Sequence, residues 1–75
     1  MRNAAAISRD SEHLLPVHVR LLLAVRTQRH WTQKQLASEL GVSTSTIAGW
    51  ENQRHEPAVL VLGVLRQLLN VPPQP

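Results

Sequence analysis

The segment from Thr32 to Asn52 constrains the fold more than any other part of this 75-residue chain. Thr32 is followed three positions later by Gln35, and this capping-box pattern satisfies two free backbone amides at a helix start. Gly41 then supplies a residue that adopts positive φ at low steric cost, as helix ends require. Ser43 follows as a second N-cap residue. The pattern predicts two short helices joined by a three-residue turn: residues 33–40, the turn 41–43, and about 44–52.

The apolar residues of these two helices predict how they pack. Leu36 and Leu40 recur on one face of the first helix, and the small Ala37 beside them is where we expect the second helix to cross. Ile47 and Trp50 recur three apart in the second helix and should point inward. The opposite side of the second helix would then present hydroxyls and small side chains outward.

Two further helices are predicted on either side of this unit. Pro16 suits a first helical turn, and Leu15, Leu22 and Val25 recur at helical spacing in a helix that ends near Arg29. Pro57 can start a last helix that runs to Asn70, where the sequence VPPQP stops it. No alternation of period two marks a strand. We therefore predict an all-α fold of four to five helices, with a flexible arm at 1–13, the domain at 14–71 and a tail at 72–75.

Composition excludes several classes of protein. The chain has no cysteine, and its four histidines lack the close pairing of zinc ligands, so no metal site or cofactor is expected. No apolar run is long enough to span a bilayer and no secretory leader is visible, so a soluble, cytoplasmic protein is expected. Eight Lys plus Arg against five Asp plus Glu give a net charge of +3, which favours a polyanionic partner. An enzyme is not expected, since no nucleophile, base and acid recur at usable spacing.

The order of residues resembles the helix-turn-helix of the Cro and lambda-type repressor family, also called the xenobiotic response element (XRE) family. That family's pattern is Ser or Thr, then Gln, Leu-Ala, Gly-Val-Ser, an Ile, an aromatic residue or Leu before Glu-Asn, a basic residue and a Pro. The likeness covers roughly residues 19–71, and a compact lambda-repressor-like domain is implied. The matching residues are Thr32-Gln33, Leu36-Ala37, Gly41-Val42-Ser43, Ile47, Trp50-Glu51-Asn52, Arg54 and Pro57.

The resemblance implies two sets of DNA contacts. Phosphate contacts are expected from Gln33, Asn52 and Arg54. The basic Lys34 next to Gln33 is a further candidate for a phosphate contact, with a solvent-facing position as the alternative. Family members that read bases strongly often carry Gln, Arg or Asn on the second short helix, whereas this helix offers only hydroxyls and small residues. We therefore expect modest base reading, supplemented by water and DNA shape. The residues expected to read bases are Ser43, Thr44, Ser45, Ala48, Gly49 and Gln53, with Gly49 allowing close backbone approach to DNA.

Two structural features also follow from the resemblance. Arg26 and Glu51 match a family pair in which the arginine fixes the orientation of the recognition helix. Leu60 and Val64 stand where the family usually has polar residues, so the last helix is apolar on more than one side. The core can take one stripe, expected to be Val59, Leu62, Leu65 and Leu69. The surplus at Leu60 and Val64 predicts either a homodimer interface or a contact with a partner protein's groove, and we favour the homodimer.

The function predicted is a sequence-specific regulator of transcription that binds double-stranded DNA as a homodimer, acting as a repressor or autorepressor. One alternative is an antitoxin-type, phage or plasmid regulator that also binds a cognate protein, and another is an interaction module without DNA binding. Trp31 and Trp50 are interpreted as core residues. The histidines are interpreted as surface residues, with phosphate contact by His30 and His55 left open.

Overall fold

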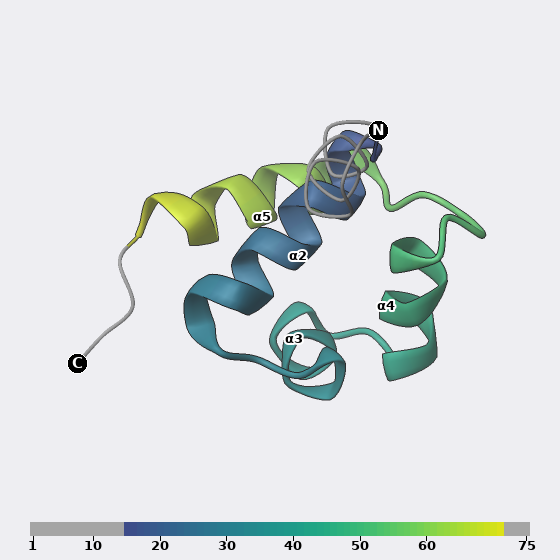
Figure 1. The fold of residues 1–75 in the computed structure, drawn as a ribbon, viewed down its shortest axis with the longest axis horizontal. Coiled ribbons are helices and arrows are strands. Elements are labelled where there is room, and N and C mark those ends of the chain that lie inside the picture. The colour runs from purple at the N-terminus through teal and green to yellow at the C-terminus, as the bar shows by residue number, and fades with distance from the viewer. Residues whose placement is uncertain (1–14, 72–75) are drawn as a thin grey trace, which may run out of the picture.

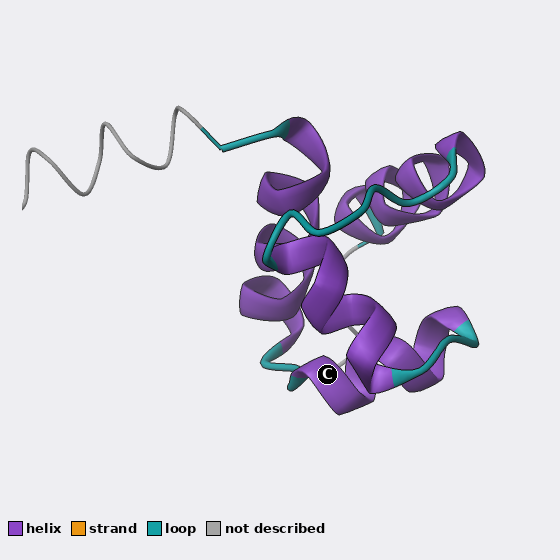
Figure 2. Cartoon of the chain, turned by 90° about the vertical axis from the view of Figure 1, so that its right-hand side faces the viewer, coloured by secondary structure: helices purple, strands orange, loops and turns teal. Residues whose placement is uncertain are grey.

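A computed structural model of the chain describes residues 15–71, which form four α-helices (Figure 1). They are α2 (Val17–Arg29), α3 (Gln33–Leu40), α4 (Thr44–Glu51) and α5 (Val59–Asn70). No strand lies in this part of the chain, as Figure 2 shows, so the all-α prediction is confirmed. The predicted arm at 1–13 and tail at 72–75 lie outside the described residues.

The core forms where α2 meets the other helices. α2 crosses the middle of the domain and packs against α5 and against α4, while α3 packs against α4 (Figure 1). Burying one apolar stripe from each of these short helices is the main source of stability in a domain of this size. The residues of the buried cluster are Leu22, Val25, Leu36, Ala37, Ile47, Trp50 and Leu65, and Val19 of α2 is buried as well.

Three helices are followed within two residues by a residue with positive φ, but only one of those residues is glycine. Gly41 ends α3 at φ 73°, as predicted, whereas His30 ends α2 at φ 58° and Gln53 follows α4 at φ 62°. At each end the next amide reaches back to a free carbonyl, as when the Val42 N–H donates to the Ala37 oxygen at 3.0 Å. These bonds reverse the chain tightly, so the helices can be joined by short turns.

The positions of two apolar residues correct one prediction and refine another. Val59 was expected in the core but is 82% exposed, because α5 begins there and its inward side runs instead through Leu65, with Val61 packed against the core. Trp31 packs against the core as interpreted but is only half-buried, and the guanidinium of Arg29 lies 5.4 Å from its ring centroid. The start of the last helix also moves from Pro57 to Val59, with Ala58 as N-cap.

Arg29 has a structural role that its sequence context did not reveal. Its Nη2 donates to the carbonyl oxygens of Leu68 at 2.9 Å and Val71 at 2.8 Å. These carbonyls belong to the end of α5, where backbone oxygens lack partners within the helix. A side chain of α2 thus caps the last helix and fastens it across the domain.

None of the described helices combines the length and the apolar character needed to cross a membrane. Within residues 15–71, no group of three metal-ligating side chains comes together.

Candidate nucleic-acid interface

The turn between α3 and α4 is built by two capped helix ends. The Gln35 N–H donates to Thr32 Oγ1 at 3.1 Å, and the Thr32 N–H donates to Gln35 Oε1 at 2.8 Å, so the predicted capping box is present. Ser43 then caps α4 by accepting from the Thr46 N–H at 3.1 Å. Both helices therefore start at fixed positions, which sets the direction of α4 relative to α3.

The inward side of α4 is anchored as the sequence predicted. Ile47 is fully buried and Trp50 is 6% exposed, and both lie in the core cluster. Thr44 and Ser45 are exposed, so the first turn of α4 offers its hydroxyls to solvent. α4 can therefore present an outer face to a partner without disturbing the core.

Most of the residues predicted to read bases lie on this exposed part. Ser43 is exposed, Ala48 is half-buried, and Gln53 is exposed in the turn after α4. Ser43 Oγ lies 3.1 Å from Ser45 Oγ and 2.8 Å from the hydroxyl of Thr46, so the hydroxyls form one cluster. Such a cluster can make single hydrogen bonds to base edges and contact a thymine methyl group.

Gly49 was predicted to allow close approach of the backbone to DNA, but the structure covers this position. Gly49 is buried, because the ring of His55 lies directly on it. A Cβ added at Gly49 would collide with His55 Nε2 and would lie 3.0 Å from Cε1. The missing side chain therefore makes room for an imidazole of the same chain.

The predicted phosphate-binding residues divide into two groups. Lys34, Asn52 and Arg54 are exposed and free to meet DNA phosphates. Gln33 is half-buried, and its Nε2 donates to Glu51 Oε1 at 2.9 Å. In this state Gln33 ties the start of α3 to the end of α4.

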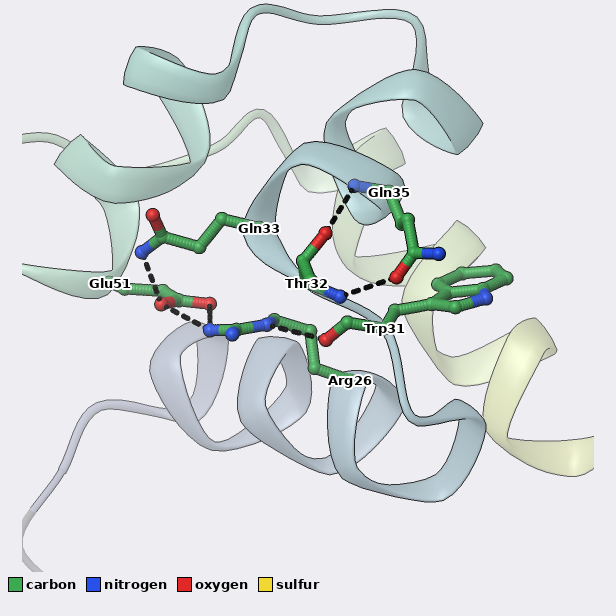
Figure 3. A network of polar contacts seen from close by, with 6 residues as sticks. All are labelled: Arg26, Trp31, Thr32, Gln33, Gln35 and Glu51. Carbon is green, nitrogen blue, oxygen red and sulfur yellow. Dashed lines mark hydrogen bonds and ion pairs between the residues drawn. The ribbon is translucent and has the colours of Figure 1, made fainter.

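The ion pair predicted between Arg26 and Glu51 is present and lies at the centre of a polar network (Figure 3). Arg26 Nη1 is 2.9 Å from Glu51 Oε1 and 3.0 Å from Oε2, and its Nε donates to the Trp31 carbonyl at 3.1 Å. Gln33 reaches the same carboxylate from α3. One carboxylate at the end of α4 thus joins α2, α3 and α4, so the network orients the helix that carries the exposed hydroxyls.

Sequence reasoning missed a buried histidine behind α4. His18 is 7% exposed, and its Nε2 lies 3.2 Å from the carbonyl oxygen of Trp50. The signal was present, since His18, Leu22 and Val25 share one face of α2 at four- and three-residue spacing. The interpretation of all histidines as surface residues is wrong at this position, where the imidazole fastens the end of α4 to α2.

The end of α4 gives a testable effect on stability. Because a side chain at positive φ costs about 1 kcal/mol, we expect Gln53→Gly to raise the free energy of unfolding by about 0.5–1 kcal/mol. Gly41→Ala, at φ 73°, should lower it by a similar amount. Urea unfolding followed by tryptophan fluorescence measures both. A Gln53→Gly protein less stable than the parent would contradict this account of the turn.

The fold and this site define a class, an all-α domain built around a helix-turn-helix. The chain matches the family described as Helix-turn-helix over residues 22–75, which is most of its length. It belongs to the XRE family of Cro and lambda-type helix-turn-helix domains, a family of DNA-binding regulators of transcription. Comparisons with curated proteins and with solved structures give no significant match. The family resemblance drawn from the sequence is confirmed.

Proposed function

We propose that this chain is a sequence-specific regulator of transcription that places α4 in the major groove of double-stranded DNA. The observation that carries the proposal is the anchoring of Ile47 and Trp50 in the core, which leaves Thr44 and Ser45 exposed on a capped helix. The major groove is about 12 Å wide and admits one α-helix. The exposed Lys34, Asn52 and Arg54 flank α4 in the sequence and supply phosphate contacts.

Repression would require only that the bound domain occupies DNA that other proteins need. A domain that covers a promoter excludes other proteins from the same DNA, with no further activity needed. The hydroxyls of α4 give weak base discrimination, so we infer that DNA shape and a second half-site supply much of the sequence preference.

The test is selection of bound duplexes from a random pool, followed by binding of the selected duplex at several salt concentrations. We expect an enriched site with two-fold symmetry, and affinity that falls linearly in a double-logarithmic plot against salt. Salt-dependent binding without enrichment of any site would show that the protein binds DNA without sequence specificity. No binding at low salt would favour an interaction module without DNA contact.

The exposed face of α5 supports the proposal of a homodimer. Leu60 is 84% and Val64 47% exposed, and beside them lies a hollow of about 270 Å³ lined by both residues with Glu39, Leu40 and Val61. Apolar side chains at the edge of a hollow suit a self-complementary contact, in which each copy fills the hollow of the other. A two-fold dimer would place two α4 helices about 34 Å apart, one turn of DNA.

Val64→Lys is expected to raise the dimer dissociation constant more than tenfold, because a charge buried in an interface costs well over 1 kcal/mol. Val17→Lys is the matched control, since Val17 is 44% exposed on α2 and does not line this hollow. Sedimentation of both variants and the parent over a range of concentrations measures the effect. A parent that is monomeric at micromolar concentration would remove the homodimer and favour a cognate protein as the partner of α5.

A further inference from the structure

His55 occupies the place of a side chain that α4 lacks. Ser45 and Gly49 are four residues apart in α4, so their positions lie on the same face, one turn from each other. Ser45 is exposed there, but Gly49 has no side chain to offer. The atom nearest to where a Cβ of Gly49 would lie is His55 Nε2, with Cδ2 at 3.2 Å. A hydrogen-bonding atom thus stands at the position from which a side chain of residue 49 would extend.

The backbone after α4 brings the ring to this position. The Arg54 N–H donates to the Gly49 carbonyl at 2.8 Å, and the Gln53 N–H donates to the Trp50 carbonyl at 3.1 Å. Together with the positive φ of Gln53, these bonds fold the chain back along the helix it has just left. The ring of His55 also contacts Trp50 edge to face, with centroids 6.5 Å apart. The imidazole is therefore held against α4 from two sides.

The ring of His55 is held in place by packing, and its nitrogens are not engaged in hydrogen bonds within residues 15–71. His55 is exposed, and its nitrogens make no hydrogen bond to any residue between 15 and 71. His18 differs, since it is buried and its Nε2 lies on a backbone oxygen. The charged residues next to His55 in the chain, Arg54 and Glu56, are exposed as well. The imidazole is therefore positioned with its Nε2 edge against Gly49, makes no hydrogen bond within residues 15–71, and leaves the exposed remainder of the ring available to a ligand.

We propose that His55 is a DNA-contacting residue, which donates a hydrogen bond to an acceptor of the DNA from the position left empty by Gly49. This inference rests on the proposed placement of α4 in the groove. A phosphate oxygen and a base-edge acceptor share the required chemistry. Gly49 then serves the contact indirectly, because any side chain at residue 49 would displace the imidazole.

A double-mutant cycle tests the pair. We expect His55→Ala and Gly49→Ala each to weaken binding to the selected duplex about fivefold, the size of one hydrogen bond. Once the ring is absent, Gly49→Ala should have no further effect, so the double variant should match His55→Ala. A further loss in the double variant would overturn the proposal and would assign the close contact to Gly49 itself. Thermal unfolding checks that each variant is folded, and we expect it to be, since His55 is exposed and alanine favours a helix.

Further binding measurements identify the DNA acceptor and provide the controls. Equal losses on selected and random duplexes, with a smaller salt slope, would assign a phosphate, whereas a loss on the selected duplex alone would assign a base edge. His55→Gln should recover part of the affinity, which a purely structural ring would not allow. Glu56→Gln, in the same loop, should not weaken binding. If His55→Ala binds like the parent while Ser45→Glu abolishes binding, the His55 contact is wrong and the placement of α4 stands.

Discussion

Arg26→Met is expected to lower the free energy of unfolding by about 2 kcal/mol, because it leaves the largely enclosed carboxylate of Glu51 without its cation. Glu51 is only 10% exposed and Arg26 is 26% exposed, so the pair is enclosed but still reached by water. That exposure places the expected loss somewhat below the roughly 3–5 kcal/mol found when one partner of a fully buried pair is removed. The Trp31 carbonyl loses its donor in the same variant, which adds to the cost.

The double variant Arg26→Met with Glu51→Met should be more stable than Arg26→Met alone. Removing both charges leaves no unpaired carboxylate, and methionine fills a similar volume with apolar atoms. Gln33 would lose its acceptor but lies close enough to the surface to hydrogen-bond water. Arg20→Met is the control, since Arg20 is exposed on the same helix and should cost little. A double variant less stable than Arg26→Met would contradict this account. It would mean that the other hydrogen bonds of Glu51 stabilise the fold by more than the unpaired carboxylate destabilises it.

The helices were predictable because their signals are local. The pair Thr32 and Gln35, the glycine at 41 and the cap at Ser43 each act within one helical turn, so the bounds of α3 and the start of α4 could be read directly. The positive φ of His30 and Gln53 could not be predicted, because nothing in those side chains indicates it, although the ends of both helices were placed within a residue or two. Such ends are imposed by packing and by backbone bonds on either side. For the same reason Val59 was misplaced, since its exposure depends on where α5 begins.

The residues of the candidate site that match the family pattern could be predicted from the sequence, and the contacts outside that pattern could not. The pattern fixed the inward positions of Ile47 and Trp50 and the pair Arg26–Glu51. The contact between His55 and Gly49 needed coordinates, because it depends on how the chain turns after α4. In the sequence alone, a glycine predicted on the outer face of a helix is equally compatible with an open surface and with a side chain of the same protein packed on it. Only the three-dimensional arrangement distinguishes these two interpretations.

Ser45→Glu is expected to weaken binding to the selected duplex about a hundredfold, because it places a carboxylate where α4 meets the phosphates and acceptor edges of the groove. Ser45 is exposed one turn before the covered Gly49, and its hydroxyl is not the cap that starts α4, so the domain should still fold. Thr27→Glu is the matched control: it changes an exposed hydroxyl residue of α2 to the same acid and lowers the net charge by the same amount. Long-range repulsion alone would weaken both variants equally, and screening by salt would remove the difference from the parent. A loss confined to Ser45→Glu and persisting at higher salt therefore requires α4 itself to lie against the DNA, whereas equal losses in the two variants would show that DNA binds another face.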